Sequence, residues 1–220
     1  MLEKMFSPAQ VIGTRRWENS SMYEIEIIMP TSKPEHWNTV KRLKCQVGLL
    51  EYRDYTPALW TENPNTCTLF IEAAHHGKGS EWVRKLQRGD EILLGEAHAA
   101  NLPAKLGAIL GLGDATAIGH FLALKQLTNP TISPLQVGIV TDDQCQIPLD
   151  FNTDHSEFSF LSGATGQSLK LLKSWIETLN LDNYASIYIV GNIALVKSLR
   201  SLLKSKVTPD TKIYGHGFWS

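Results

Sequence analysis

The chain has 220 residues, of which 43% are hydrophobic and 20% are charged, and its net charge at pH 7 is -1. These values are typical of a globular protein with one large domain or two small ones, and the charge gives no reason to expect a nucleic-acid partner. No apolar run approaches the length of a membrane span, and the N-terminal residues lack the apolar core of a signal peptide. The three cysteines are widely spaced, so we expect a cytoplasmic protein with no disulfide framework and no metal site.

The first hundred residues read mainly as β-strands separated by turns. Residues 21–29 alternate apolar and polar side chains, which is typical of a strand with one buried face. A turn around Pro64 separates two later strands. Short strands with few helices predict a small antiparallel β-barrel over residues 1–100. Its strands are expected at residues 21–29, 45–56, 66–74 and 90–97.

The pattern changes near residue 103, where strands and helices begin to alternate. Residues 135–143 form a continuous apolar run, as expected for a parallel strand that is buried on both faces. The alternation predicts a parallel α/β domain over residues 101–220, which a polar link at 97–105 joins to the barrel. Strands are expected at residues 105–114, 135–143, 185–192 and 211–217, and helices at 115–127, 167–179 and 193–204.

The first candidate site is the sequence RDYT, residues 53–56, at the end of an apolar run. In an extended strand Arg53 and Tyr55 would share one face, and Thr56 would sit at the turn before Pro57. A cation, a flat ring and a hydroxyl on one face suit a planar ligand that carries a phosphate. The same pattern is typical of an ordinary strand end with solvated side chains.

A second candidate site is HHGKGSEW, residues 75–82, where glycines precede a helix that is expected to begin near Glu81. Ser80 is a candidate N-cap, and Lys78 adds positive charge. The N-terminus of a helix presents N–H groups and a partial positive charge, which together can bind an anion. The alternative is a capped surface helix with a flexible approach.

A third candidate site is GLGDATAIG, residues 111–119, which follows a buried strand. It is a near-match to the glycine pattern of nucleotide-binding turns, with Thr116 in the position of the third glycine. The alternative is a plain turn from strand to helix with Asp114 as the N-cap. Gly191 follows another strand of the same half, at the end where open α/β sheets bind ligands, although a glycine there is also a common connector.

The order of these motifs resembles the siderophore-interacting protein family, the flavin-dependent ferric-siderophore reductases of the ferredoxin-reductase-like superfamily. RDYT resembles the family's R-x-Y-[ST] flavin motif, and HHGKGSEWVRKLQRGDEILLGE resembles its H-G...S-x-W...GD stretch. LGLGDATAIGHFLALKQL, YIVGNIALVKSLRSLLK and the terminal YGHGFWS resemble its later segments. The resemblance covers residues 10–220 in the family's order.

The resemblance implies an N-terminal antiparallel flavin-binding β-barrel over residues 1–100, followed by a parallel α/β domain over 101–220 that binds NAD(P)H. It implies that Arg53 pairs with a flavin phosphate, while Tyr55 and Thr56 lie at the flavin ring and take part in catalysis. Further FAD contacts are implied for His75, His76, Gly77, Lys78, Gly79, Ser80 and Trp82. The nicotinamide nucleotide would meet Gly113, Asp114, Thr116, Ala117, Gly191 and Asn192.

The implied activity is a hydride relay in which NAD(P)H reduces FAD, and the reduced flavin then reduces a ferric siderophore or another ferric chelate so that iron leaves as Fe(II). Acids at Asp142 and Asp143, after the second strand of the α/β half, favour NADH over NADPH, although an exposed turn explains them equally well. One alternative function is electron transfer to a protein partner such as a ferredoxin or haem protein. Another is a non-catalytic binding protein that has lost its flavin.

Two further features of the sequence are a lone histidine and a group of basic residues. His120, in the helix expected at residues 115–127, is expected to be structural. Six basic residues make the C-terminal helices positive, which usually marks a solvated helix face but would also attract an anionic ferric siderophore. They are Lys170, Lys173, Lys197, Arg200, Lys204 and Lys206.

Overall fold

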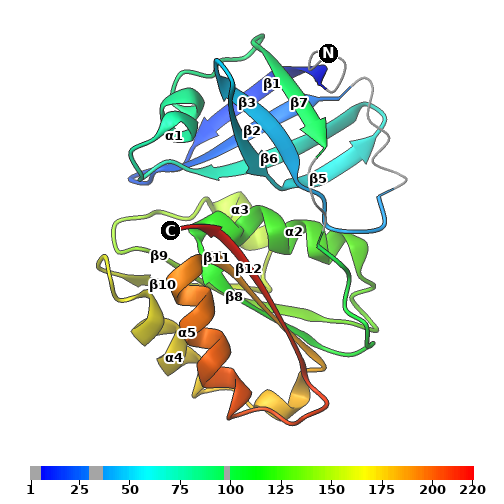
Figure 1. Ribbon diagram of the computed structural model, residues 1–220, viewed down its shortest axis with the longest axis vertical. Helices are drawn as coiled ribbons and strands as arrows, with labels where there is room; N and C mark the ends of the chain where they lie inside the picture. The colour runs from blue at the N-terminus through cyan, green and yellow to red at the C-terminus, as the bar shows by residue number, and fades with distance from the viewer. Residues whose placement is uncertain (1–5, 30–36, 97–99) are drawn as a thin grey trace. The chain divides into compact units, whose positions relative to one another are not determined.

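The computed structural model describes residues 6–29, 37–96 and 100–220, and it divides into two compact units. The first unit consists chiefly of Ser21–Leu102 together with the N-terminal strand, and the second consists chiefly of Pro103–Phe121 and Thr128–Ser220. Figure 1 shows a sheet without long helices in the first unit and a sheet flanked by helices in the second. Within the described residues, no helix is long and apolar enough to cross a membrane.

The first unit is a seven-stranded antiparallel sheet with the strand order β4-β3-β7-β1-β2-β6-β5. Side chains alternate across it, because β2 buries Ile25 and Ile27 and leaves Glu26 exposed between them. Helix α1 (Lys78–Val83) lies between β6 and β7 in the chain. The strands are β1 (Ser7–Arg16), β2 (Met22–Ile28), β3 (Leu43–Gly48), β4 (Glu51–Tyr55), β5 (Pro57–Glu62), β6 (Asn65–Glu72) and β7 (Glu91–Glu96).

The two edges of this sheet are linked by a single residue. β4 and β5 stand at opposite ends of the strand order, but only Thr56 separates them in the chain. The sheet must therefore curl until its edges come together at Thr56. This geometry confirms the predicted antiparallel barrel, whose core includes Val11, Ile25, Cys45, Cys67 and Leu69.

The predicted strands at 21–29, 66–74 and 90–97 are confirmed as β2, β6 and β7. The single strand predicted at 45–56 is wrong, because the chain turns at Leu49 and Leu50 and forms the hairpin of β3 and β4. Leu50 has a positive φ of 59°. This turn conformation is rare for leucine, so the residue type does not predict it. β1 and β5 were not predicted.

The second unit is a five-stranded parallel sheet with the order β10-β9-β8-β11-β12. The strands are β8 (Ile109–Asp114), β9 (Leu135–Asp142), β10 (Phe158–Gly163), β11 (Ser186–Asn192) and β12 (Lys212–Trp219). The helices that alternate with these strands along the chain are α2 (Ile118–Leu127), whose residues Leu122–Leu127 belong to the first unit, α3 (Leu149–Asp154), α4 (Ser168–Ile176) and α5 (Ile193–Lys204), with short 3-10 turns η3 (Ala115–Ala117) and η4 (Leu181–Asn183).

The strand order of the second unit places a topological switch point between β8 and β11. The chain runs outward from β8 through β9 to β10, and then returns to β11 on the other side of β8. In open α/β sheets, ligands bind at the carboxyl ends of the strands at such a point. Those ends carry Asp114 and Asn192, which are both among the predicted nucleotide contacts.

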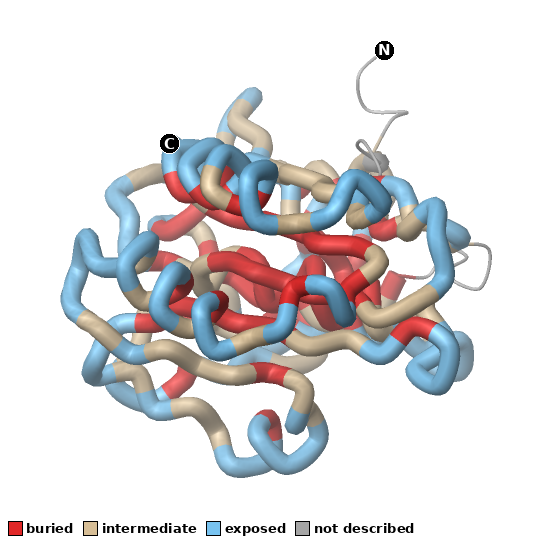
Figure 2. Tube along the Cα trace, turned by 90° about the horizontal axis from the view of Figure 1, so that it is seen from below, coloured by how far each residue is buried: buried red, intermediate tan, exposed pale blue. Residues whose placement is uncertain are grey.

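The sequence periodicity predicted most of the second unit correctly. The parallel α/β architecture is confirmed, although β8 begins at Ile109 and not at residue 105. The predicted helix at 115–127 divides into η3 and α2, and β10 and α3 were not predicted. Buried segments, drawn in red in Figure 2, run through the inside of the protein, and exposed segments, drawn in pale blue, lie on its surface.

Candidate functional site

Strand β4 and helix α1 meet at Gly79, although the two segments are well separated in the sequence. β4 carries Arg53 and Tyr55 at alternate positions, so both side chains leave the same face of the strand. A Cβ atom at Gly79 would lie 2.5 Å from the Tyr55 hydroxyl oxygen and 3.3 Å from Cγ of Arg53. Only glycine permits this approach. The first two candidate motifs therefore form one cluster within the first unit.

The Tyr55 ring is stacked on Trp82 of α1. The ring centroids are 5.9 Å apart and the ring planes differ by 10°, which is an offset stack. Both rings pack against the core of the barrel, and Tyr55 keeps partial exposure. Burial raises the pKa of the Tyr55 hydroxyl well above its ordinary value. The phenol therefore remains protonated at neutral pH and can donate a hydrogen bond.

Arg53 and Thr56 flank Tyr55 with opposite degrees of exposure. The Arg53 side chain is exposed, and its Nη1 donates a hydrogen bond of 2.7 Å to the carbonyl oxygen of Tyr52. A guanidinium has five N–H donors, so this one bond leaves it able to hold a phosphate with two others. Thr56 is only 8% exposed and lies at the junction of β4 and β5.

Helix α1 begins at Lys78, three residues before the predicted start near Glu81. The prediction that Ser80 caps the helix is wrong: Gly77 is the N-cap residue, no described side chain caps the helix, and Ser80 is buried within it. The N–H group of Glu81 donates to the Gly77 carbonyl at 3.0 Å. The N–H groups that precede Glu81 in the first turn of α1 have no acceptor within that helix. Lys78, the first residue of α1, stands beside them.

The two histidines before α1 are both exposed but differ in their neighbours. Nε2 of His75 lies 3.4 Å from Oε2 of Glu72 on β6. Oε1 of the same carboxylate also accepts from the N–H group of Ala74 at 2.7 Å. The structure thus directs His75 toward the sheet, whereas no interaction of His76 is found among the described residues.

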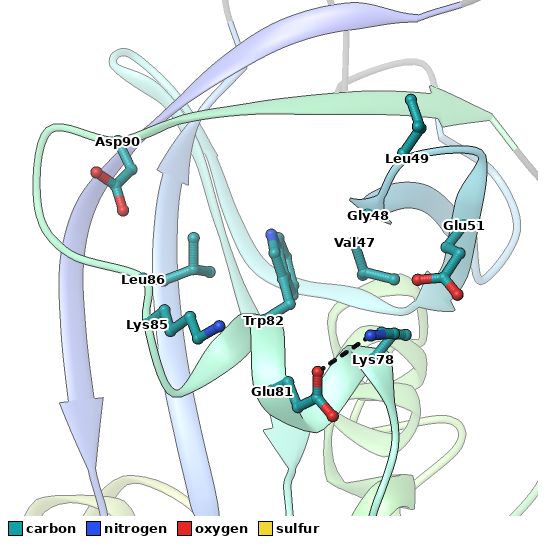
Figure 3. A pocket seen from close by; sticks show the side chains of 10 residues that line it. All are labelled: Val47, Gly48, Leu49, Glu51, Lys78, Glu81, Trp82, Lys85, Leu86 and Asp90. Carbon is teal, nitrogen blue, oxygen red and sulfur yellow. Dashed lines mark hydrogen bonds and ion pairs between the residues drawn. The ribbon is translucent and has the colours of Figure 1, made fainter.

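An open hollow of about 610 Å³ lies beside α1 in the same unit (Figure 3). One wall is the end of the β3–β4 hairpin, and the other is α1 with the residues that follow it. This hollow was not predicted, because its walls are far apart in the chain. One signal was available: Glu51, which lines the hollow, stands two residues before Arg53, so strand alternation places both on one face.

In the second unit, Asp114 joins the ends of β8 and β11. Its Oδ2 accepts from the N–H group of Asn192 at 2.7 Å, and its Oδ1 accepts from the N–H group of Thr116 at 3.0 Å and from the Thr116 hydroxyl. Asp114 is therefore the N-cap residue of η3, because its carboxylate accepts from the first turn of that helix. Burial raises the pKa of the Asp114 carboxyl, and these hydrogen bonds partly offset the shift.

The glycine at position 191 is required by this carboxylate. Its φ is +126°, and a Cβ atom there would lie 2.4 Å from Oδ2 of Asp114. Asn192 is the N-cap of α5, because its side chain accepts from the N–H group of Leu195 at 3.1 Å. The predicted residues Gly113, Asp114, Thr116, Ala117, Gly191 and Asn192 thus lie on the adjacent ends of β8 and β11 and on η3.

Trp219 was not among the predicted nucleotide contacts. Trp219 pairs with Asn192 in the sheet, and the Trp219 side chain helps to lower the pKa that burial raises at Asp114. Asp142 ends the neighbouring strand β9 and is exposed, as is Asp143. His120 is fully buried beside His216, with ring centroids 5.2 Å apart, as expected of a structural residue.

No group of three or more metal-ligating side chains occurs among residues 6–29, 37–96 and 100–220. No model of a known protein family matches the sequence, and no curated protein matches it.

Solved structures do match the chain. The siderophore-interacting protein from Acinetobacter baumannii superposes with a TM-score of 0.72 and 16% sequence identity, over 97% of this chain and 90% of its own. The ferredoxin-NADP+ reductase from Plasmodium falciparum superposes with a TM-score of 0.69 and 16% identity, over 96% of each chain. The chain has the ferredoxin-reductase-like fold.

The ferredoxin-reductase-like fold also occurs within longer proteins. CYP116B46 from Tepidiphilus thermophilus superposes with a TM-score of 0.74 and 15% identity, over 98% of this chain. This chain spans 29% of that protein. At these identities the likeness shows a shared fold.

The cluster on β4 and α1 has the chemistry needed to hold a flavin nucleotide on a ferredoxin-reductase-like barrel. An arginine binds phosphate with paired hydrogen bonds, and an aromatic ring stacks on a planar ring system. Gly77 has no atom within 4 Å of the place where a Cβ atom would stand, so the backbone beside it is open to a ligand. The residues present therefore fit the group.

Proposed function

We propose that the chain is a flavin-dependent NAD(P)H:ferric-siderophore reductase of the siderophore-interacting family. The unit built on residues 1–100 would bind FAD, and the unit built on residues 101–220 would bind the nicotinamide nucleotide. Because NAD(P)H is the electron donor, the activity belongs in the cytoplasm.

One observation carries this proposal, namely the meeting of β4 and α1 at Gly79. The contact gathers a phosphate-binding cation at Arg53, a flat ring at Tyr55 and the N-terminus of a helix. A strand end with only solvated side chains does not require a glycine on a neighbouring helix to make room for its tyrosine hydroxyl. This coincidence favours a ligand site over the alternative of a solvated strand end.

Each residue of this cluster has a proposed task. Arg53 neutralises a flavin phosphate, and the Tyr55 ring fixes the plane of the isoalloxazine. Thr56, which is sheltered from water, presents its hydroxyl to the polar edge of that ring. His76, Gly77, Lys78 and Ser80 bind the phosphates beside α1, with His75 next to them and Trp82 behind Tyr55. The flavin, when bound, accepts a hydride and releases single electrons.

The nucleotide is proposed to bind at the switch point of the second unit. Gly113, Thr116, Ala117 and Asn192 would border it, and Asp114 would hold the two strand ends in register. The exposed Asp142 at the end of β9 would accept hydrogen bonds from a ribose and repel a 2′-phosphate. On this argument NADH is the preferred donor.

A second candidate acceptor is an electron-transfer protein in place of a ferric chelate. Helices α4 and α5 lie side by side in the second unit (Figure 1), and their basic residues are exposed. A basic face attracts an acidic protein as readily as an anionic chelate. The third alternative, a non-catalytic member of the family, predicts that the chain binds no flavin.

The first experiment is to purify the protein, add FAD and record the visible absorption spectrum. The proposal predicts the two visible bands of an oxidised flavin, bleaching by NADH, and fast reduction of a ferric siderophore. Arg53→Gln is expected to weaken FAD binding about tenfold or more, because it removes a charge-assisted contact to phosphate. The exposed Arg88→Gln, in the same unit, is the control.

Other outcomes favour the alternatives. Bleaching by NADH without turnover of a ferric chelate would favour a protein acceptor. A colourless protein that does not take up FAD would overturn the reductase proposal and leave the non-catalytic alternative.

A further inference from the structure

Strand β5 is interrupted by a bulge in which a leucine takes an unfavourable conformation. The register with β6 shifts between Ala58 and Thr61, so Leu59 and Trp60 together stand opposite one residue of β6. Leu59 has a φ of 51°, in the left-handed region that residues with a Cβ atom avoid. Bulges redirect side chains and are frequent beside functional sites, where such strain also gathers. The bulge therefore points to a specific direction for Trp60.

The backbone of Trp60 is held by a side chain of α2. Within the described residues β5 pairs only with β6, so the outer side of β5 has no neighbouring strand. The carboxamide of Gln126 takes that place. Its Oε1 accepts from the Trp60 N–H group at 3.2 Å, and its Nε2 donates to the Trp60 carbonyl oxygen at 2.7 Å. Because Gln126 belongs to the part of α2 that lies in the first unit, these two bonds fix Trp60 within that unit.

The indole of Trp60 meets the indole of Trp37 edge to face. The ring centroids are 5.3 Å apart, and the ring planes differ by 70°. Both side chains pack against the barrel core, and both remain only half-buried. Two rings at this angle form a corner, in which a third ring can stack on one indole and meet the edge of the other. We call this pair, Trp37 and Trp60, the aromatic corner.

The aromatic corner is close to the proposed flavin site along the chain. Trp60 comes four residues after Thr56, which is proposed to face the polar edge of the flavin ring. The two residues lie within about 14 Å of each other, because an extended chain spans at most about 3.6 Å per residue. A molecule bound at the aromatic corner is thus placed to receive electrons from the flavin. The electron acceptor is therefore the occupant that fits this place.

The composition of the aromatic corner favours an acceptor that itself carries aromatic rings. Two indoles offer flat apolar surfaces and N–H donors, but no charge. A catecholate or phenolate chelate presents flat rings whose iron-bound oxygens can accept hydrogen bonds. A hydroxamate or carboxylate chelate presents similar oxygens without the rings, so it gains nothing from stacking.

We propose that Trp37 and Trp60 bind an aromatic ring of the ferric chelate, and that they make the protein selective for catecholate or phenolate chelates over aliphatic ones. Gln126 is a positioning residue that acts through the backbone of Trp60. This inference rests on the proposed function, because it names the class of acceptor that the same site reduces.

The test measures the binding of two gallium(III) chelates, a tricatecholate and citrate, by titration calorimetry in the presence of FAD. Gallium(III) resembles iron(III) but is not reduced, so binding is measured without turnover. The wild type is expected to bind the tricatecholate about tenfold more tightly than the citrate, as one ring stack allows. Trp60→Leu and Trp37→Leu are each expected to remove this preference and to leave citrate binding unchanged, whereas Trp60→Phe keeps a ring and retains most of it.

Tyr23→Leu is the matched control, because it removes another half-buried ring that packs against the same core, outside the aromatic corner. A wild type without a preference, or the same loss in Tyr23→Leu as in Trp60→Leu, would overturn the inference. Reduction of ferric citrate by NADH in the same preparation would then leave the proposed function standing. Selective binding of the gallium tricatecholate, without reduction of any ferric chelate, would support the aromatic corner and overturn the proposed function.

Discussion

The contact between Gly79 and Tyr55 can be tested with one methyl group. Gly79→Ala places a carbon 2.5 Å from the Tyr55 hydroxyl, and Trp82 prevents the ring from moving aside freely. We expect the free energy of unfolding to fall by about 1–3 kcal/mol, as for other overpacked positions. Urea denaturation followed by tryptophan fluorescence measures this change.

Gly77→Ala is the matched control for that substitution. Gly77 has an extended φ of 164° and no atom within 4 Å of the added carbon, so only its N-cap preference is lost, which costs at most about 1 kcal/mol. If both variants lost the same stability, the close approach at Gly79 would not be the cause.

The buried carboxyl of Asp114 gives the protein a predictable dependence on pH. Its pKa is raised above the ordinary 3.8, so the folded state binds this proton more tightly than the unfolded state does. Its contribution to stability is therefore fully present below pH 3.8 and declines as the pH rises through the folded pKa. Asp114→Asn removes this pH-dependent contribution to stability and keeps one acceptor oxygen in the side chain.

The measurement is the free energy of unfolding of the wild type and of Asp114→Asn across the acidic and neutral range. We expect the stability of the wild type relative to the variant to fall as the pH rises. A difference that is constant, or that grows with pH, would contradict the raised pKa.

At the scale of elements, the β3–β4 hairpin contains a local conflict that a substitution should relieve. Leu50 is 71% exposed and has a φ of 59°, a conformation that costs a leucine about 1–2 kcal/mol. Leu50→Gly removes that strain and loses somewhat less through the entropy of the unfolded chain, so we expect a gain of roughly 0.5 kcal/mol. Thermal unfolding by circular dichroism measures it.

The neighbouring Leu49→Gly is the control, because Leu49 is not among the residues with a positive φ. It is expected to lose roughly 0.5–1 kcal/mol through chain entropy alone. Equal shifts for the two variants would show that the turn at Leu50 carries no strain.

Elements with a strong period were predictable, and those defined by an unusual turn were not. The alternation of Ile25 and Ile27 with Glu26 predicted β2, and the apolar run at 135–143 predicted β9. The hairpin of β3 and β4 was missed because two exposed leucines form its turn, where glycine or asparagine is the usual signal. Similarly, α1 was placed too late because its cap is the backbone of Gly77.

Long-range contacts explain what the sequence could not predict about the candidate sites. The pairing of Asp114 with Asn192 joins residues 78 positions apart, and the approach of Gly79 to Tyr55 depends on the curl of the whole sheet. The motifs could be recognised individually, but their distances could not. The resemblance gave the order of the motifs, and the structure gives the contacts.

At the scale of the whole molecule, the three thiols differ in their access to solvent. Cys45 and Cys67 are buried in the barrel, and burial raises the pKa of both thiols, whereas Cys145 is half-buried. Only the thiolate reacts rapidly with a disulfide reagent. We expect Ellman's reagent to modify one thiol of the native protein quickly, and all three in guanidinium. Fast modification of Cys45 or Cys67 in the native state would contradict this packing.

The single-residue link at Thr56 has a consequence for motion. Because the sheet runs from β4 to β5, each of these strands pairs with only one neighbour, and the proposed flavin residues stand on one of them. Strands at a margin fray first, so amide hydrogens there exchange by small openings while the centre of the sheet stays closed. A ligand bound across Arg53 and Tyr55 would hold β4 against these small openings. Its binding would therefore slow amide exchange in β4 at ligand concentrations too low to change the global unfolding temperature.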